Sequence, residues 1–349
     1  MMKTVCIMDN ENNKTRREFL GDVLWTGSVA AMGGLACLGM SSDASGASKD
    51  TPDLISMTRI EPEMILYEEI NEPVPTGFSE SRSVTVDGSG TLYVTGDQAV
   101  RIFSSRGRIR ETIKLTVSPF CLVPTDVQFY IGTRERVVIT DRKGKVLTTW
   151  STLGDNAWIT SMILADEHIY IADGGQRIVW CYDLEGNFIR RIGDKDPERN
   201  IPGFVVPGPY FDLAMAPDGL LRVANPGRHQ IEAYTVKGDR EFAWGKFGNR
   251  LEDFTACCNP VSFTILDDGN IITCEKGVAR VKVYEPFGKL KGFVADPKQL
   301  ANVSPSVGMK QERVQRFGFD VAADGSGHVY ILDRARNVVR IFKNKDIDS

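Results

Sequence analysis

The stretch Ala323–Phe342, ADGSGHVYILDRARNVVRIF, contains an Asp-Gly turn, a short apolar strand, a polar turn and a second apolar strand. The chain repeats this phrase six times, and the other copies are Val86–Phe103 (VDGSGTLYVTGDQAVRIF), Phe129–Thr140 (FYIGTRERVVIT), His168–Tyr182 (HIYIADGGQRIVWCY), Ala216–Tyr234 (APDGLLRVANPGRHQIEAY) and Leu266–Tyr284 (LDDGNIITCEKGVARVKVY). Alternating apolar positions indicate strands, and glycine supplies the positive φ that the tight turns need. Such repeats are typical of a propeller. They predict an all-β fold, a six-bladed β-propeller over residues 60–349.

The last blade reaches the end of the chain without an outermost strand of its own. The apolar segment 64–70, MILYEEI, precedes blade one and is free to complete that sheet. Residues 287–296, which directly follow the third strand of blade five, are expected to form the outermost strand of that blade. A ring closed by strands from both termini leaves no exposed sheet edge. We therefore expect the N- and C-terminal strands to share one blade.

Residues 1–47 resemble a bacterial twin-arginine signal peptide. The segment 14–20, KTRREFL, places two arginines before Phe and Leu, a weakly apolar stretch follows over 23–40, and Ser45-Gly46-Ala47 offers a cleavage site. Residues 48–59 then form a linker. We expect a periplasmic or otherwise extracytoplasmic protein that contacts the membrane only through this leader. The alternative is a lipid anchor at Cys37, although the preceding Gly-Leu-Ala makes a poor lipoprotein signal.

Charge and cysteine content narrow the classes of partner. The formal net charge is −4 and charged residues make up 25% of the chain, so no extended basic surface for nucleic acid is indicated. Five cysteines follow the leader, at positions 121, 181, 257, 258 and 274. An odd number in an oxidising compartment leaves at least one thiol outside any intramolecular disulfide.

The repeats resemble the NHL class of six-bladed propellers. The shared pattern is an Asp-x-x-Gly turn, an aliphatic-Tyr-Val strand, an Asp, and then Arg-aliphatic-x-x-aromatic. Blades one, three and six match it through Tyr93, Tyr170 and Tyr330, whereas blades four and five have Asn225 and Glu275 where the pattern has Asp. Within this class the chain resembles an uncharacterised bacterial subgroup with twin-arginine leaders and a Cys-Cys-Asn-Pro segment. The resemblance implies a fold but no single activity, since propellers of this kind include lyases, lactonase-like enzymes and binding modules.

A cysteine cluster in blade five is the sharpest candidate site. In a propeller, the loops entering the innermost strands share a face with the loops between second and third strands, so Cys257, Cys258 and Cys274 should gather near the channel. With His229 they form a candidate set for zinc, copper or iron. Adjacent Cα atoms lie about 3.8 Å apart, whereas disulfides prefer roughly 4.4–6.8 Å, so a Cys257–Cys258 bond would be strained. Three alternative hypotheses remain. Cys274 could form a disulfide with Cys257 or Cys258, the thiols could be inert, or one thiol could act as a nucleophile.

The same face should carry further ligand-contacting residues from blades three to five. We select those in the loops that share the face of the cysteines, namely Asp173, Arg177, Tyr210, Asn225, Arg228, Asn259 and Glu275. The chain has only three histidines, which gives little material for the multi-histidine metal centre of amidating-lyase-type propellers.

The sequence therefore favours an exported propeller that acts as a binding module. Its partner would be a protein or a small-molecule ligand, and an association with a redox or metalloprotein partner is one form of this hypothesis. The alternative is an enzyme, a metal- or thiol-dependent lyase or hydrolase at the mouth of the channel.

Overall fold

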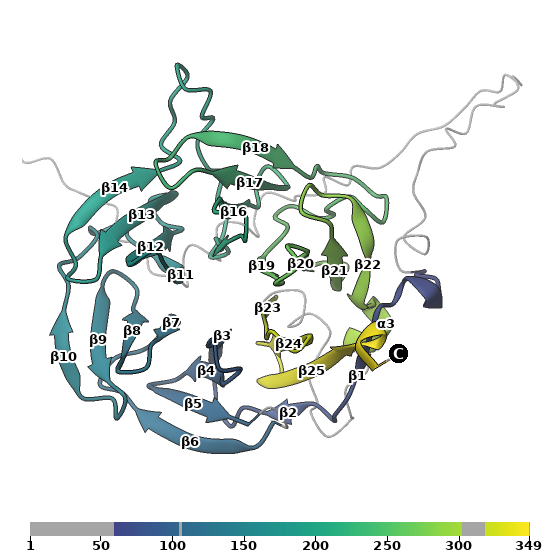
Figure 1. The fold of residues 1–349 in the computed structure, drawn as a ribbon, viewed down its shortest axis with the longest axis horizontal. Coiled ribbons are helices and arrows are strands. Elements are labelled where there is room, and N and C mark those ends of the chain that lie inside the picture. Colours follow the sequence, from purple (N-terminus) through teal and green to yellow (C-terminus); the bar gives the residue numbers. More distant parts are fainter. Residues whose placement is uncertain (1–58, 105–106, 302–317, 349) are drawn as a thin grey trace, which may run out of the picture. The chain divides into compact units, whose positions relative to one another are not determined.

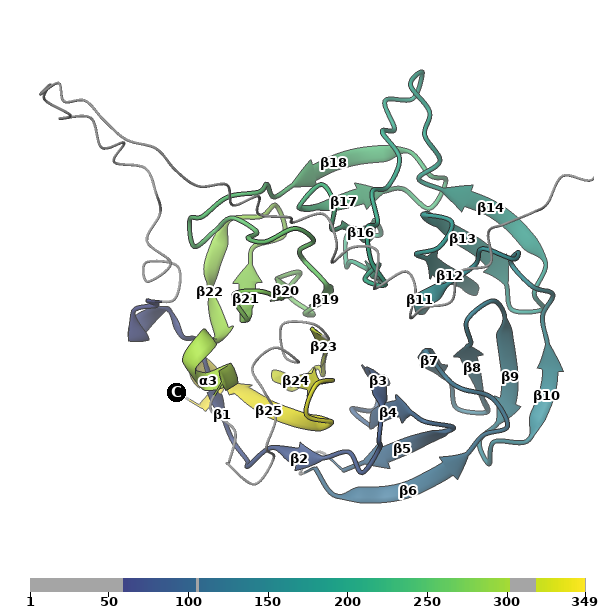
Figure 2. The ribbon, with the colours of Figure 1, turned by 180° about the vertical axis from the view of Figure 1, so that it is seen from behind.

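The structure, a computed structural model, describes residues 59–104, 107–301 and 318–348. The predicted leader, and the linker up to residue 58, lie outside these residues. The described part forms six antiparallel sheets arranged as a six-bladed β-propeller, which confirms the predicted fold. Figure 1 and Figure 2 show the blades following one another around the ring in sequence order.

Blades one to three each contain four strands from one continuous segment. Their strands, from the channel outward, are β3 (Ser81–Val86), β4 (Leu92–Gly96), β5 (Ala99–Phe103) and β6 (Ile109–Lys114); β7 (Cys121–Pro124), β8 (Gln128–Gly132), β9 (Val137–Asp141) and β10 (Val146–Thr149); and β11 (Ile159–Ala165), β12 (His168–Asp173), β13 (Ile178–Asp183) and β14 (Phe188–Ile192).

Blades four and five have the same order, while blade six combines both ends of the chain. Their strands are β15 (Leu213–Met215), β16 (Leu221–Asn225), β17 (Gln230–Tyr234) and β18 (Arg240–Trp244); β19 (Ser262–Ile265), β20 (Ile271–Glu275), β21 (Arg280–Tyr284) and β22 (Leu290–Ala295); and β23 (Phe319–Ala323), β24 (His328–Asp333) and β25 (Val338–Asn344) with β1 (Tyr67–Glu69) and β2 (Val74–Pro75). The helical turns are η1 (Pro62–Met64), α3 (Pro297–Ala301) and η2 (Lys345–Asp348).

The ring closes in blade six as predicted. Strand β1 pairs antiparallel with β25, with Glu69 opposite Phe342, and β2 pairs with the beginning of the same strand. Arg340, which is 1% exposed, donates from Nε and Nη2 to the two carboxylate oxygens of Glu69 at 2.7 and 2.6 Å. This bidentate ion pair is both charge-assisted and directional, so it fixes the N-terminal strand on the last blade.

The repeated Asp and Tyr residues have a local structural role. In blade one, the Asp87 carboxylate accepts hydrogen bonds from two backbone N–H groups of its turn and from the Tyr93 hydroxyl, the last at 2.7 Å. In blade six, Tyr330 donates to Asp324 in the same way at 2.8 Å. Because both tyrosine rings are buried, the pair satisfies a buried hydroxyl and fixes the turn together. The sequence pattern is therefore a folding signal.

Candidate functional site

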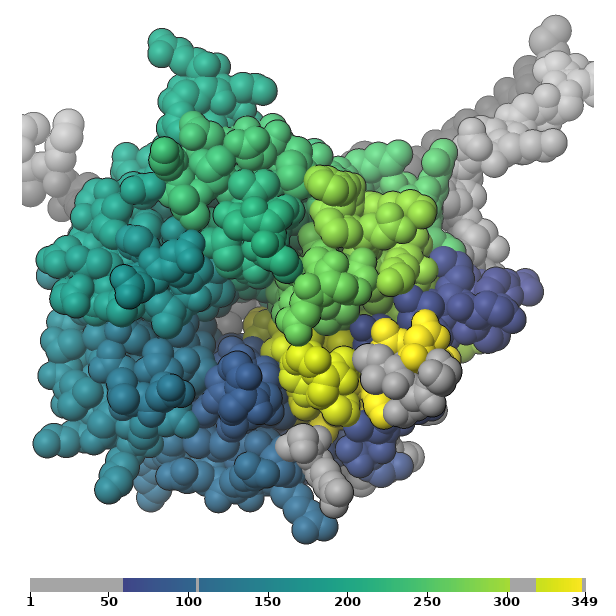
Figure 3. All heavy atoms as spheres, in the orientation of Figure 1, coloured from purple at the N-terminus to yellow at the C-terminus, as the bar shows by residue number. Residues whose placement is uncertain are grey.

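A cavity of about 160 Å³ lies on the propeller axis. All six innermost strands line it, and Arg334 from the loop between β24 and β25 also contributes. Figure 3 shows a narrow hollow at the centre of the ring. The lining carries many short polar side chains, which are Ser83, Thr85, Thr160, Ser161, Ser262 and Thr264. The channel is thus polar and suits only a small occupant.

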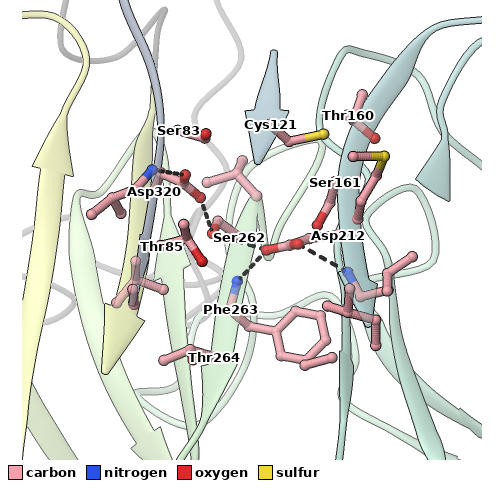
Figure 4. Close-up of a pocket in the computed structure, with 18 of the residues that line it drawn as sticks. Ser83, Thr85, Cys121, Thr160, Ser161, Asp212, Ser262, Phe263, Thr264 and Asp320 are labelled. Atoms are coloured by element: carbon pink, nitrogen blue, oxygen red, sulfur yellow. Dashed lines mark hydrogen bonds between the residues drawn. The ribbon is translucent and has the colours of Figure 1, made fainter. Parts of the chain in front are cut away.

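Two carboxyl groups meet around one hydroxyl in this channel (Figure 4). Ser262 Oγ lies 2.9 Å from Asp212 Oδ2 and 2.7 Å from Asp320 Oδ1. These three side chains come from the innermost strands of blades four, five and six or the residue leading into them. They connect three blades at the axis by hydrogen bonds between separate sheets.

Backbone donors hold both carboxylates in place. Asp212 accepts from the N–H groups of Leu213 and Phe263, both at 2.9 Å, so it connects blade four to blade five. Asp320 accepts from the N–H of Val84 at 2.9 Å and connects blade six to blade one. These contacts continue the interblade linkage on either side of Ser262.

The hydrogen-bond count around Ser262 requires a proton. A hydroxyl carries one hydrogen and donates to one carboxylate at a time, so its second short contact is favourable when that carboxyl is protonated and donates to Oγ. Arg334 Nη2 lies 3.5 Å from Asp320 Oδ1, so a positive charge stands beside this pair of carboxyl groups. Burial, and then the nearby Asp320 charge, raise the pKa of Asp212 to about 6. The channel wall therefore binds a proton in a mildly acidic range.

These residues were not among the predicted site residues, but the repeats contain a signal for them. Ser83, Asp212, Ser262 and Asp320 each stand four positions before the first residue of the turn that joins the first and second strands of their blade. Ser161 of blade three stands in the same register, so alignment of the repeats on that turn places a polar side chain at the axis in five blades. Inspection of each sequence motif separately does not reveal this axial position.

The predicted cysteine cluster separates into two parts. Cys257 is exposed and Cys258 is 6% exposed, and their sulfur atoms lie 3.2 Å apart. Cys274 is fully buried in the hydrophobic core with Val261 and Val281. All five cysteines of the described residues are free thiols, so the Cys274 disulfide considered from the sequence is not present.

His229 does not join the thiols as a ligand. Its Nε2 lies 2.7 Å from the carbonyl oxygen of Ala256, and its ring packs edge-on against Phe247. Within residues 59–104, 107–301 and 318–348, no three His, Cys, Asp or Glu side chains are arranged to hold a metal ion. The zinc, copper or iron site remains a prediction that this arrangement does not support.

Four of the predicted ligand-contacting residues are fully buried, and their hydrogen bonds lie within the fold. Asp173 accepts from the N–H groups at 158, 175 and 176, and Asn225 bridges the N–H of residue 205 to the Glu232 carboxylate. Asn259 bonds to both backbone groups of residue 276, and Glu275 pairs with Arg280 and Lys282. These bonds shape the loops of the face, and a ligand-binding role for the four stays untested.

The other three predicted residues differ in exposure. Arg177 and Arg228 are exposed on the loops after β12 and β16. Tyr210 is 7% exposed, lines the channel, and lies under the Lys276 ammonium, whose nitrogen is 4.8 Å from the ring centroid. Tyr210 is therefore the one predicted ligand residue that reaches the cavity.

Comparisons with known proteins support the fold. No protein-family model matches the chain, and no curated protein matches it. Similar solved structures include virginiamycin B lyase from Staphylococcus aureus, with a TM-score of 0.52 and 11% identity over 79% of this chain and 98% of that one. A gluconolactonase from Xanthomonas campestris gives 0.54 and 14% over 79% and 89%. The WD40 propeller domain of Doa1 gives 0.52 and 14% over 80% and 98%.

These likenesses show the propeller fold alone, because the identities are low and proteins with one fold differ widely in activity. The molecule is a six-bladed β-propeller, and its membership of the NHL class stays a prediction. Among the described residues, no helix has the length and apolar character needed to cross a membrane.

Proposed function

We propose that this protein is an exported binding module whose partner protein docks on one rim of the propeller. The rim is formed by loops of blades four and five, and we call it the blade 4/5 rim. It consists of Val205, Arg228, His229, Phe247, Cys257 and Lys276. The observation that carries the proposal is Phe247, a large aromatic side chain that is 61% exposed yet held in place by the His229 ring 5.2 Å away.

The rim is continuous. The N–H of Gly227 donates to the carbonyl of Val205, which places the loop before blade four beside the Arg228 loop. His229 then contacts both Phe247 and the backbone of Ala256, the residue before Cys257. Asn259 connects the cysteine segment to Lys276. Loops from four places in the sequence therefore form one surface.

The chemistry of this surface suits a protein partner with an apolar group and acidic side chains. An ordered, exposed aromatic ring loses little conformational entropy on binding, and such rings are enriched among the residues that dominate interface energy. Arg228, the residue before His229, is exposed, and Lys276 is half-buried over Tyr210. Rim cations of this kind attract an acidic partner and increase the association rate.

The channel is less suited to catalysis on a sizeable substrate. Its volume is about 160 Å³, and Asp212 and Asp320 use their oxygen atoms to accept hydrogen bonds from neighbouring blades. A catalytic carboxyl group needs to reach a proton of the substrate, and here that capacity is occupied by structural donors. This favours binding on the rim over the enzyme alternative.

The test is affinity isolation of the tagged protein from its native extracytoplasmic fraction, comparing Phe247→Asp with Phe287→Asp. Phe287 is 72% exposed in the turn between β21 and β22, at the opposite end of blade five, and so controls for the loss of a surface aromatic ring. We expect one protein to be recovered in stoichiometric amounts with the wild type and the Phe287 variant, and at least about tenfold less with Phe247→Asp.

Equal recovery with both variants would place the partner elsewhere, and no stoichiometric partner for the wild type would refute the binding function. Metal analysis of the recovered protein tests the narrower hypothesis of a redox or metalloprotein partner. Metal analysis of the propeller itself tests the predicted zinc, copper or iron site.

A further inference from the structure

Cys257 and Cys258 present two neighbouring thiols with different exposure. The Cys258 S–H donates to Cys257 Sγ across 3.2 Å, and Cys257 is the exposed member of the pair. Because Cys257 is exposed, its sulfur is the one that a disulfide in solvent reaches first. Cys258 is 6% exposed, and its sulfur lies within contact distance of Cys257 Sγ.

We propose that Cys257 and Cys258 form a dithiol site that low-molecular-weight disulfides oxidise to a disulfide between these two adjacent residues. This site goes beyond the proposed function and does not depend on it. It also differs from the metal set predicted from the sequence, because it uses neither Cys274 nor His229.

The surrounding contacts hold the two thiols together. On one side, the His229 ring contacts the carbonyl of Ala256 at 2.7 Å. On the other, Asn259 donates to the carbonyl of Lys276 and accepts from its N–H, each at 2.9 Å. The segment is thus fixed immediately before and after the cysteines, so the strain of a bond between them falls on the two residues themselves.

The reaction balances as two thiol–disulfide exchanges. The Cys257 thiolate attacks one sulfur of the small disulfide RSSR, forms a mixed disulfide and releases the thiolate RS⁻. Cys258 then loses its proton to solvent, and its sulfur attacks Cys257 Sγ and releases the second RS⁻. The protein loses two electrons and two protons overall, and the small disulfide is reduced to two molecules of RSH.

Burial makes the second step the slower one. It raises the pKa of Cys258 to about 11, the hydrogen bond to Cys257 acts in the same direction, and the Lys276 charge partly opposes both. The mixed disulfide forms first on Cys257 because that thiol is the exposed one, and ring closure follows. Since adjacent Cα atoms are about 3.8 Å apart, shorter than most disulfides allow, the product is strained and readily reduced again. Such a bond suits a reversible modification.

Cys274 does not compete for the bond. Its side chain is 0% exposed within the core, and burial, followed by the charges of Asp320 and Asp212, raises its pKa well above the usual range. A buried neutral thiol does not attack a disulfide in solvent.

The experiment treats the folded, reduced full chain with oxidised glutathione and follows intact mass and peptide maps. For the wild type we expect the loss of two hydrogen atoms, located in a peptide that contains both Cys257 and Cys258, and rapid reversal by reduced glutathione. Cys258→Ser should stop at one glutathione on Cys257. Cys257→Ser should react at least about tenfold more slowly, because the remaining thiol is buried. Cys274→Ser, the control, should behave as the wild type.

Three outcomes would overturn the proposal. They are a disulfide that includes Cys274, a wild-type protein that stays glutathionylated, and a wild-type protein that does not react. The wild-type measurement alone distinguishes all three, so the proposal does not depend on the folding of any variant.

Discussion

Replacement of Asp212 by Asn tests the shared proton in the channel. The pKa of Asp212 is raised from its ordinary value of 3.8 to about 6 by burial and by the charge of Asp320. The folded state therefore favours the protonated carboxyl. The stabilisation that the proton provides is complete below pH 3.8 and is lost as the pH rises through about 6. The Asn variant has no proton to lose at this position.

The size of the effect follows from the shift. About two pKa units correspond to about 3 kcal/mol, and solvent screening of this half-buried, cavity-facing group reduces the expected value to about 1–2 kcal/mol. The groups that face it are Asp320, Ser262, Ser161, and Arg334, which lies beside Asp320. These groups remain in the variant, so comparing the two proteins isolates the titration of residue 212.

The assay is urea unfolding of both proteins at steps from about pH 4 to about pH 8. The free energy of unfolding of the wild type, relative to Asp212→Asn, should fall by about 1–2 kcal/mol over this range. Asp239→Asn is the control, because a hydrogen bond from Arg199 lowers the pKa of this exposed carboxylate and its contribution should change with pH in the opposite direction. A difference that stays constant, or that rises with pH, would refute the shared proton.

Three further substitutions test the fold around the site by urea unfolding. Arg340→Met should cost about 3 kcal/mol, because it leaves the Glu69 carboxylate without its two-pronged partner, whereas Lys289→Met at an exposed pair should cost less than about 1 kcal/mol; similar costs would show that the closure contact adds nothing. Ser262→Ala should cost about 1–3 kcal/mol, because two buried carboxyl groups lose the hydroxyl that joins them; a cost below about 0.5 kcal/mol would contradict this. Asn225→Ala should lower stability by about 1–3 kcal/mol and leave partner recovery at the level of the wild type, whereas a loss of partner from a folded variant would restore its ligand-binding role.

The repeated phrase was sufficient to predict the sheets and their closure. Strand periodicity and turn glycines act over a few residues, so each blade can be recognised without knowing its neighbours. The closing strand was predictable as well, because blade six lacked an outer strand and the segment around Tyr67 belonged to none of the six repeats. The Asp87–Tyr93 contact shows why the pattern is so regular, since it satisfies a buried hydroxyl within one turn.

Contacts between blades were decided only by the tertiary structure. Ser262 meets carboxylates 50 and 58 residues away in sequence, and the closeness of these groups at the axis depends on how the blades pack. The cysteine prediction was limited for the same reason. Cys257, Cys258 and Cys274 were expected to gather near the channel. In the structure the β20 side chain of Cys274 packs in the core, whereas of the two loop thiols Cys257 is exposed and Cys258 is buried beside it. Sequence periodicity specifies which residues form a strand, whereas packing decides which side chains meet across blades and how much solvent reaches them.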